Sequence, residues 1–304
     1  KTLPVSITVT SAVDIPTDPN DPNYLADKNI HLVAEVSNKN PFLNEAISVS
    51  YKLYVSPDTG VNNWRELEAP RYADFWSNNI DIKSLNVQNG TFKGQPYRYV
   101  VLRRTLLYPQ KTGELKIEPL TLDISVQVPS NRRDFFGNLI SSSVNKTVSS
   151  GSSIIDVKSL PIDNKPKDFS GAVGSFSFEI KSDKKELLTD EAFQLSLIVS
   201  GDGNFNLFED PKISLPNSLE VYEPEKISNV SVRASGIKGN INNKYTVVPN
   251  NPGKYTIPKT KFSFFNPVSA EYKTIYSDPI FIDVDGAYNS SLGYSDITEK
   301  NRTN

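Results

Sequence analysis

The stretch Asn44-Glu45-Ala46-Ile47-Ser48-Val49-Ser50-Tyr51 has a counterpart in the second half of the chain, Asp190-Glu191-Ala192-Phe193-Gln194-Leu195-Ser196-Leu197. A second pair of stretches matches further along each half. In both, a proline lies four residues before a glycine and an isoleucine four residues after it, as Pro109, Gly113, Ile117 and as Pro249, Gly253, Ile257. Two landmarks that recur in the same order indicate an internal repeat. The sequence therefore predicts two copies of one module.

Alternating apolar residues identify the module as β-structure. Ile30, Leu32, Ala34 and Val36 share one face of a strand, and the odd-numbered residues from Ile47 to Val55 share another. The 21 prolines and 14 tyrosines suit strands and turns. Helical periodicity nowhere exceeds a turn or two. The predicted fold class is all-β, with two tandem immunoglobulin-like β-sandwich domains.

Proline-bounded and polar stretches mark the domain limits. The first sandwich is predicted at residues 1–160, a linker at 161–166, the second sandwich at 167–285, and a disordered or connecting tail at 286–304. Within the first sandwich, residues 5–9 and 115–128 are expected to be strands, 14–23 a loop, 129–137 an excursion from the core, and 141–153 an edge strand. Residues 201–204 are expected to form a tight turn because glycine tolerates positive φ.

Composition excludes several classes of function. The 304 residues carry a net charge of -2, which gives no basic field for nucleic acid. There is no cysteine, hence no disulfide or thiol chemistry. No stretch reaches the roughly 20 apolar residues that span a bilayer. The absence of methionine predicts that the chain is a fragment, with any signal segment or membrane anchor outside it.

Catalytic and metal-binding candidates are few. His31 is the single histidine and alternates with apolar residues, so it is expected on the solvent face of its strand, without the partners of a catalytic triad. Asp18 to Asn23, with Asp27, offers oxygen ligands for calcium, but its spacing does not match an EF-hand loop and a surface loop is favoured. No enzyme activity, cofactor or metal is predicted.

One cluster predicts a binding surface. Trp64, Glu66, Tyr72, Asp74 and Trp76 lie within 13 residues of one another, and aromatic residues beside arginines are typical of protein-binding hot spots. A tryptophan that fills the sandwich core explains the same pattern. Both interpretations stay open, and the two tryptophans need not share one environment.

Several motifs follow one another in an order that resembles a known family. They are Tyr51-Lys52-Leu53-Tyr54, Pro70 to Trp76, Leu107 to Gly113, Asp134-Phe135-Phe136-Gly137, Val157 to Pro161, Phe169 to Gly174, Gly201-Asp202-Gly203-Asn204 and Phe262 to Pro267. Together they resemble the BatD (oxygen-tolerance, aerotolerance) family of exported bacterial proteins over nearly the whole chain, up to about Val284.

The resemblance implies a location and partners. Members have a signal peptide, β-sandwich domains in the periplasm and a transmembrane helix near the C-terminus. They are encoded beside von Willebrand A-domain membrane proteins (BatA- and BatB-like) and a MoxR-type AAA+ ATPase. The chain is thus expected to be a periplasmic scaffold, attached to the inner membrane only through an anchor outside this fragment, in an envelope stress complex.

Two hypotheses use the predicted cluster. In the first, Glu66 or Asp74 completes the open coordination site of the Mg²⁺ ion held by a von Willebrand A domain. In the second, the chain is a carbohydrate- or peptidoglycan-binding module in which Trp64, Tyr72 and Trp76 stack on sugar rings. An exposed pair of aromatic residues on one sheet face would favour the second hypothesis.

Overall fold

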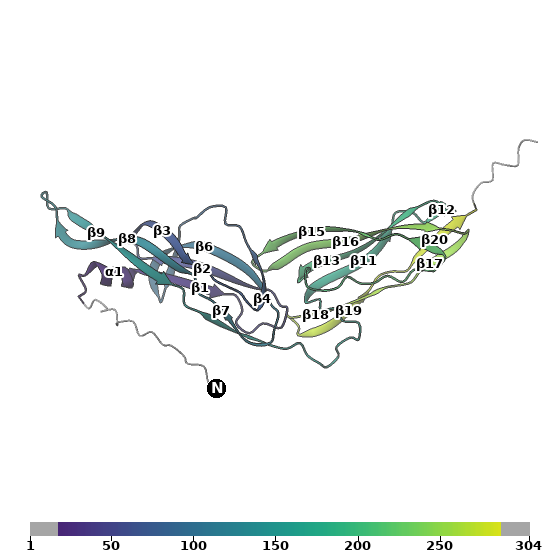
Figure 1. Cartoon of the computed structure of the whole chain (residues 1–304), viewed down its shortest axis with the longest axis horizontal. Coiled ribbons are helices and arrows are strands. Elements are labelled where there is room, and N and C mark those ends of the chain that lie inside the picture. Colours follow the sequence, from purple (N-terminus) through teal and green to yellow (C-terminus); the bar gives the residue numbers. More distant parts are fainter. Residues whose placement is uncertain (1–17, 287–304) are drawn as a thin grey trace, which may run out of the picture. The chain divides into compact units, whose positions relative to one another are not determined.

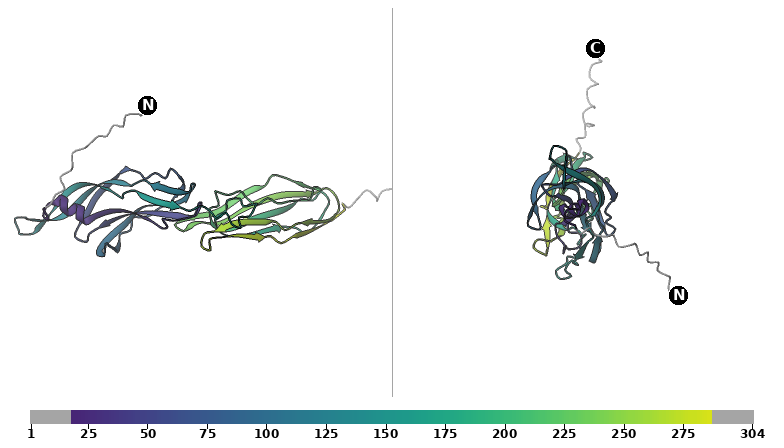
Figure 2. Two further views of the ribbon diagram at one scale, coloured as in Figure 1. Left: turned by 90° about the horizontal axis from the view of Figure 1, so that it is seen from below. Right: turned by 90° about the vertical axis from the view of Figure 1, so that its left-hand side faces the viewer.

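The chain divides into two compact units, with the division between Ser159 and Leu160. The structure is a computed structural model and describes residues 18–286. Each unit consists of β-strands arranged in two layers (Figures 1 and 2). The predicted fold class, two tandem sandwiches of the immunoglobulin type, is therefore confirmed. The predicted strand at residues 5–9 and the predicted tail lie outside the described residues, apart from Gly286.

The first unit has two layers of strands and one short helix. One layer has the strand order β1–β2–β6–β4, with β5 also pairing β6; the other contains the sheets β3–β8–β9 and β10–β7. The elements are α1 (Pro22–Asn29), β1 (Ile30–Val36), β2 (Ile47–Val55), β3 (Gly60–Glu68), β4 (Phe75–Asn79), β5 (Gln88–Phe92), β6 (Gln95–Pro109), β7 (Gly113–Ile117), β8 (Thr121–Arg133), β9 (Leu139–Ser149) and β10 (Ser153–Val157).

The core of the first unit is filled by the inward residues of both layers. Ile47, Val49 and Tyr51 of β2 are completely buried, and so are Leu122 and Val126 of β8. Their spacing of two or four residues follows from the alternation of side chains along a strand. Burying such side chains is the main source of stability for a sandwich.

The second unit repeats the plan of two layers. One layer has the order β11–β13–β16–β14, with β15 also pairing β16; the other contains β12–β20–β17 and β18–β19. The elements are β11 (Gly174–Ser182), β12 (Glu186–Leu188), β13 (Phe193–Gly203), β14 (Leu219–Val221), β15 (Glu225–Arg233), β16 (Gly236–Pro249), β17 (Gly253–Ile257), β18 (Lys261–Asn266), β19 (Glu271–Tyr276) and β20 (Ile280–Asp285). Phenylalanine rings fill its core, with Phe176 in edge contact with Phe205, Phe262 and Phe264.

The two sequence landmarks of each unit touch each other in space. Asn44 has a φ of 61° and its N–H donates to the carbonyl oxygen of Pro109 at 3.0 Å. Asp190 has a φ of 66° and its N–H donates to the carbonyl oxygen of Pro249, also at 3.0 Å. Asparagine and aspartate tolerate this left-handed backbone better than most residues. The repeat is therefore structural, and each landmark pair forms one joint.

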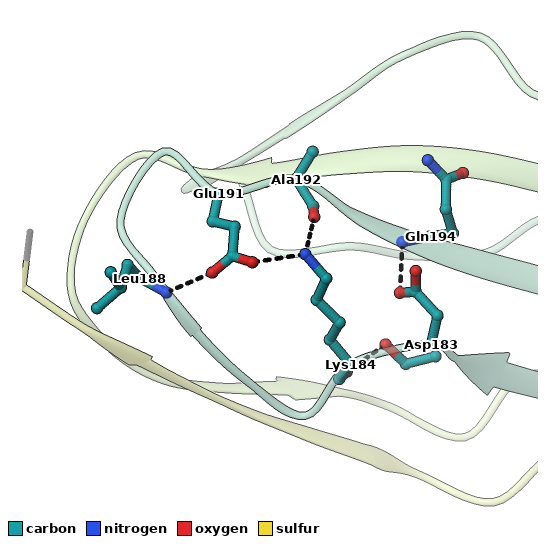
Figure 3. Close-up of polar contacts among 7 residues, drawn as sticks. Asp183, Lys184, Leu188, Glu191, Ala192 and Gln194 are labelled. Atoms are coloured by element: carbon teal, nitrogen blue, oxygen red, sulfur yellow. Dashed lines mark hydrogen bonds and ion pairs between the residues drawn. The ribbon is translucent and has the colours of Figure 1, made fainter.

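A glutamate fastens the loop at each joint. The carboxylate of Glu45 accepts the N–H of Phe42 at 2.7 Å, and that of Glu191 accepts the N–H of Leu188 at 3.1 Å. In the second unit the Lys184 ammonium lies 2.6 Å from the other oxygen of Glu191 (Figure 3). These contacts with the Lys184 ammonium and the Leu188 N–H hold the pKa of Glu191 below its ordinary value. We call this arrangement the glutamate clasp.

A third landmark completes the repeat. Ile155-Asp156-Val157 in β10 corresponds to Ile282-Asp283-Val284 in β20. The N–H of Asp156 donates to the carbonyl oxygen of Lys39, and that of Asp283 to the carbonyl oxygen of Lys185, both at 2.8 Å. The sequence comparison missed this landmark, although three identical residues carry it.

The first unit differs from the expected elements at two places. Residues 22–29 form the helix α1 in the stretch where no helix was predicted. The Asp21 side chain accepts the N–H of Asn23 and Pro22 occupies the first turn, where a missing N–H costs nothing. The expected single strand 115–128 is two strands, β7 and β8, which belong to different sheets. Glu118, Pro119 and Leu120 separate them, because proline cannot donate to the ladder.

Two long strands extend beyond their predicted ends. Residues 129–133 belong to β8, so the expected excursion is the tip of the β8–β9 hairpin, with β9 as the expected edge strand. Residues 201–203 are the last part of β13 and not a turn. Gly201 has a φ of 153°, and a Cβ on it would lie 2.2 Å from the carbonyl oxygen of Ser175. Glycine is thus needed there for close approach of β11 and not for chain reversal.

Candidate functional site

The predicted cluster is divided between the two layers of the first unit. Trp64 and Glu66 lie on β3, which pairs with β8. Trp76 lies on β4, which pairs with β6 in the opposite layer. Tyr72 and Asp74 lie between these two strands in the chain. The five residues therefore do not share one sheet face.

Trp64 borders an apolar groove. It stands opposite Ile124 of the neighbouring strand and is 37% exposed. The groove has a volume of about 400 Å³, and its other walls include Leu102 of β6 together with Leu85 and Val87. Leu85 and Val87 are both exposed. An apolar groove with an accessible tryptophan is typical of a surface that binds another molecule.

Glu66 links the two layers beside this groove. Its carboxylate accepts a hydrogen bond from Nη2 of Arg103, a residue of β6, at 2.8 Å. A charged side chain that points inward on an edge strand disfavours the addition of a further strand. The two register shifts of β3 against β8 act in the same direction. The backbone edge of β3 is therefore unsuited to pairing with another strand, and a molecule in the groove would contact the side chains of β3.

Tyr72 and Trp76 are partly buried. The Tyr72 hydroxyl lies 3.4 Å from the Tyr51 hydroxyl and donates to Oγ1 of Thr105 at 3.3 Å, so its ring packs against the core. Burial, followed by the contact with Tyr72, raises the pKa of Tyr51. The Trp76 ring lies 5.6 Å from the ring of Tyr108. These contacts match the core interpretation of the aromatic cluster for Tyr72.

Asp74 is the carboxylate of the cluster that pairs with the more exposed cation. One of its oxygens lies 2.6 Å from Nζ of Lys111, whose side chain is 70% exposed. Ion pairs at such exposed positions contribute about 0–1 kcal/mol. A competing cation could therefore displace Lys111 at low cost.

The residues considered for calcium have other roles. Asp21 caps α1, and the Asp27 carboxylate lies 2.7 Å from Nζ of Lys146 on β9. Within residues 18–286 no group of three or more histidine, cysteine, aspartate or glutamate side chains could hold a metal ion. No helix in that part of the chain is long and apolar enough to cross a membrane.

An aromatic cluster on the outer face of the first unit escaped the sequence analysis. His31, Tyr54 and Tyr99 form one cross-strand row over β1, β2 and β6. The Phe92 ring stacks on His31 at 4.4 Å and lies 5.2 Å from the Tyr54 ring. Burial lowers the pKa of His31, whose Nε2 lies 3.0 Å from the carbonyl oxygen of Lys28. The spacing of Tyr97 and Tyr99 two residues apart was the available signal.

His31 therefore lies on the outer face, as expected, but under an aromatic cover. The Lys52 ammonium lies 4.8 Å from the centre of the Tyr99 ring at the edge of the cluster. The polar groups of the cluster are bonded to one another, for example the Tyr54 hydroxyl to the Glu35 carboxylate at 2.7 Å. The cluster resembles a packed covering of the sheet more than a row of free stacking rings.

Comparisons with known proteins agree with one part of the sequence analysis. Residues 180–284 match the family described as BatD DUF11 like domain, and this match lies entirely within the second unit. It confirms the predicted resemblance for residues 180–284. No curated protein sequence matches the chain.

Similarity to solved structures is remote. The D00-D0 domain of Intimin is 12% identical, with 83% of this chain and 98% of that chain covered and a TM-score of 0.17. The adhesin InvE of Yersinia pseudotuberculosis is 13% identical, with coverages of 84% and 59% and a TM-score of 0.21. The type II cohesin dyad from the adaptor ScaA scaffoldin of Acetivibrio cellulolyticus is 9% identical, with coverages of 75% and 86% and a TM-score of 0.16. Scores this low carry no argument.

Proposed function

We propose, from the membership of residues 180–284 in the BatD family, that this protein is a non-catalytic scaffold on the periplasmic face of the inner membrane. It binds von Willebrand A-domain membrane proteins (BatA- and BatB-like) and acts through them with a MoxR-type AAA+ ATPase in an envelope stress complex. The BatD domain is the observation that carries this proposal. The arrangement of the titratable residues supports its non-catalytic part, because His31 is stacked on Phe92 and bonded to backbone.

The groove beside Trp64 is the proposed contact for a partner. Its exposed apolar walls, Leu85 and Val87, would lose contact with water on binding, at about 25 cal/mol for each Å² buried. Asp74 and Glu66 are the carboxylates proposed to reach a Mg²⁺ ion of the partner. To do so, Asp74 must first break its ion pair with Lys111, and Glu66 must break its ion pair with Arg103.

The geometry ranks the two carboxylates. The two carboxylates are about equally exposed, Asp74 at 35% and Glu66 at 34%, but Lys111 is 70% exposed whereas Arg103 is 29% exposed. Screening by water makes the Asp74 pair the cheaper one to break. We therefore expect Asp74 to be the stronger candidate.

The test uses this chain and a purified von Willebrand A domain, with binding measured by calorimetry with Mg²⁺ and with EDTA. We expect Asp74→Asn and EDTA each to weaken binding about tenfold or more, since each removes a metal–carboxylate contact. Glu118→Gln is the matched control, because Glu118 forms a similar exposed pair with Arg71. Trp64→Ala tests the groove separately.

Equal affinity for the wild type and the Asp74→Asn and Glu66→Gln variants, unaffected by EDTA, would exclude the metal-bridged contact. No binding of the wild type at all would contradict the scaffold role of these two units.

The carbohydrate hypothesis remains a prediction with fewer residues in its favour. Trp64 and Trp76 lie in opposite layers, and Tyr72 is turned toward the core, so the three rings form no common platform. Sedimentation of the chain with insoluble peptidoglycan tests it. Binding that survives Trp64→Ala would point to other residues.

A further inference from the structure

The strand β11 has one open edge. It pairs with β13 in a single unbroken register from Gly174 to Ser182, and in the described part of the chain β13 is the only strand it pairs with. Figure 1 shows β11 beside β13 at the margin of its sheet. A regular edge strand of nine residues without a bulge is a template for the addition of another strand.

The register shows which backbone groups lie on this edge. Just beyond β11, the N–H of Asp183 donates to the carbonyl oxygen of Gln194, so the pair Asp183–Gln194 is a hydrogen-bonded one. In an antiparallel pair such residues alternate with residues that direct their N–H and C=O groups the other way. Glu179 and Lys181 therefore bond to β13. Phe178, Ile180 and Ser182 direct their backbone groups to the open edge.

The side chains on the exposed face of β11 carry opposite charges. Glu179 and Lys181 are both exposed and form a pair at 2.8 Å within the strand. In antiparallel pairing of β11 with a second β11 centred on Ile180, Glu179 of each copy stands opposite Lys181 of the other. These are non-hydrogen-bonded positions, where opposed side chains approach most closely.

Other registers are less favourable. A shift by an odd number of residues would place the apolar face of one strand beside the polar face of the other. Pairing centred on Glu179 or on Lys181 would oppose like charges. Pairing centred on Phe178 would oppose Glu179 and Lys181 only to serines. Among registers that oppose residues of β11 to residues of β11, the one centred on Ile180 is the one in which both charges are matched.

We propose that two copies of this chain associate through antiparallel pairing of β11 about Ile180, forming one continuous sheet across a twofold axis. The arrangement is isologous, because the same residues contribute from both copies. A groove of about 290 Å³ lies beside this part of the edge, between Ile180–Ser182 and Pro279–Phe281. Phe281 lines this groove and is 66% exposed, and in the proposed dimer it would contact the second copy.

The first unit supplies an internal comparison. Ser37 donates its N–H to the carbonyl oxygen of Ser48 as Asp183 does to that of Gln194, so β1 corresponds to β11. Val33 and Glu35 stand where β11 has Glu179 and Lys181. The self-complementary charges are therefore specific to β11, and the second unit is the one that pairs.

The test is sedimentation equilibrium of the 304-residue chain over a range of concentrations at low ionic strength. The wild type is expected to form a weak dimer that dissociates further as salt is added. Glu179→Lys makes the exposed face of β11 wholly positive, and Lys181→Glu makes it wholly negative. Each is expected to raise the dimer dissociation constant roughly tenfold, because two attracting pairs become two repelling ones.

Two further samples identify the contact. An equimolar mixture of the Glu179→Lys and Lys181→Glu proteins should form a heterodimer at concentrations where each alone is monomeric, since the charges match again. The double variant with both changes should dimerise like the wild type. Lys254→Glu is the control, because Lys254 belongs to another exposed pair of the same unit. Circular dichroism confirms that every variant is folded.

A wild type that stays monomeric at all concentrations would overturn the proposal. So would single variants that dimerise as the wild type does, or a mixture that stays monomeric while the wild type forms dimers.

Discussion

Gly203 lies beneath the ring of Phe176. A Cβ built on Gly203 would lie 2.4 Å from the tip of that ring and 2.5 Å from the carbonyl oxygen of Val173. Phe176 is also the ring that contacts Phe205, Phe262 and Phe264 in the core. One hydrogen atom in place of a methyl group therefore lets the core ring and two strands approach one another. A turn was expected at this glycine because glycine is typical both of turns and of places where strands pack closely.

Gly203→Ala should lower the free energy of unfolding of the second unit by about 1–3 kcal/mol, the usual cost of forcing an extra carbon into a packed core. Urea unfolding followed by fluorescence or circular dichroism measures the change. Gly286→Ala is the control, because a Cβ there meets no atom within 4 Å. An alanine at position 203 that leaves stability unchanged would show that Phe176 can move aside freely.

At the scale of elements, the glutamate clasp connects segments that are distant in the chain. In the second unit, the N–H of Asp190 donates to the carbonyl oxygen of Pro249, the last residue of β16, and the Glu191 carboxylate accepts the N–H of Leu188. In the first unit, Asn44 and Glu45 make the equivalent contacts with Pro109 and Phe42. The first two residues of each matched stretch thus position the chain just before β2 and just before β13.

The clasp of the second unit should make its stability depend on pH. The folded state holds the pKa of Glu191 below the ordinary value of 4.5. Its stabilising contribution is present above 4.5 and is lost as the pH falls through the lowered pKa, because the folded state then has to accept a proton. Thermal unfolding of the wild type and of Glu191→Gln over acidic pH measures this effect.

We expect the difference in melting temperature between these two proteins to be largest above the ordinary carboxyl pKa and to shrink in acid. Glu271→Gln, at an exposed position of β19, controls for the change in net charge. A constant difference at every pH would mean that the Glu191 charge does not contribute.

At the scale of the whole molecule, each unit has its own core. The buried residues that cluster in the first unit run from Ala26 to Val157. The second unit has a separate set of buried phenylalanines and aliphatic residues in β11, β13 and β18. A chain of this length commonly forms two domains that can fold alone.

Residues 18–159 and 160–286, expressed separately, should each unfold cooperatively. Circular dichroism and thermal denaturation of the two fragments measure this, and in the intact chain Gly203→Ala should shift only the transition of the second unit. Failure of either fragment to fold would show that its core depends on the rest of the chain.

The sequence by itself determined the strand faces, the internal repeat and the BatD resemblance. Alternation with period two fixes which side chains of a strand share a face, as with Ile47, Val49 and Tyr51, and this needs no distant contact. The two landmarks were visible for the same reason, since each is a local turn or loop with its own residue preferences.

Only the tertiary structure decided which strands are neighbours and what each predicted site residue touches. Trp64 and Trp76 are close in sequence, yet β3 and β4 join opposite layers, because strand pairing depends on backbone hydrogen bonds and packing between distant segments. The pairing of Glu66 with Arg103 and of Asn44 with Pro109 arose in the same way. So did the open edge of β11, since an edge is defined by the absence of a neighbour in the described sheet, which no local pattern records.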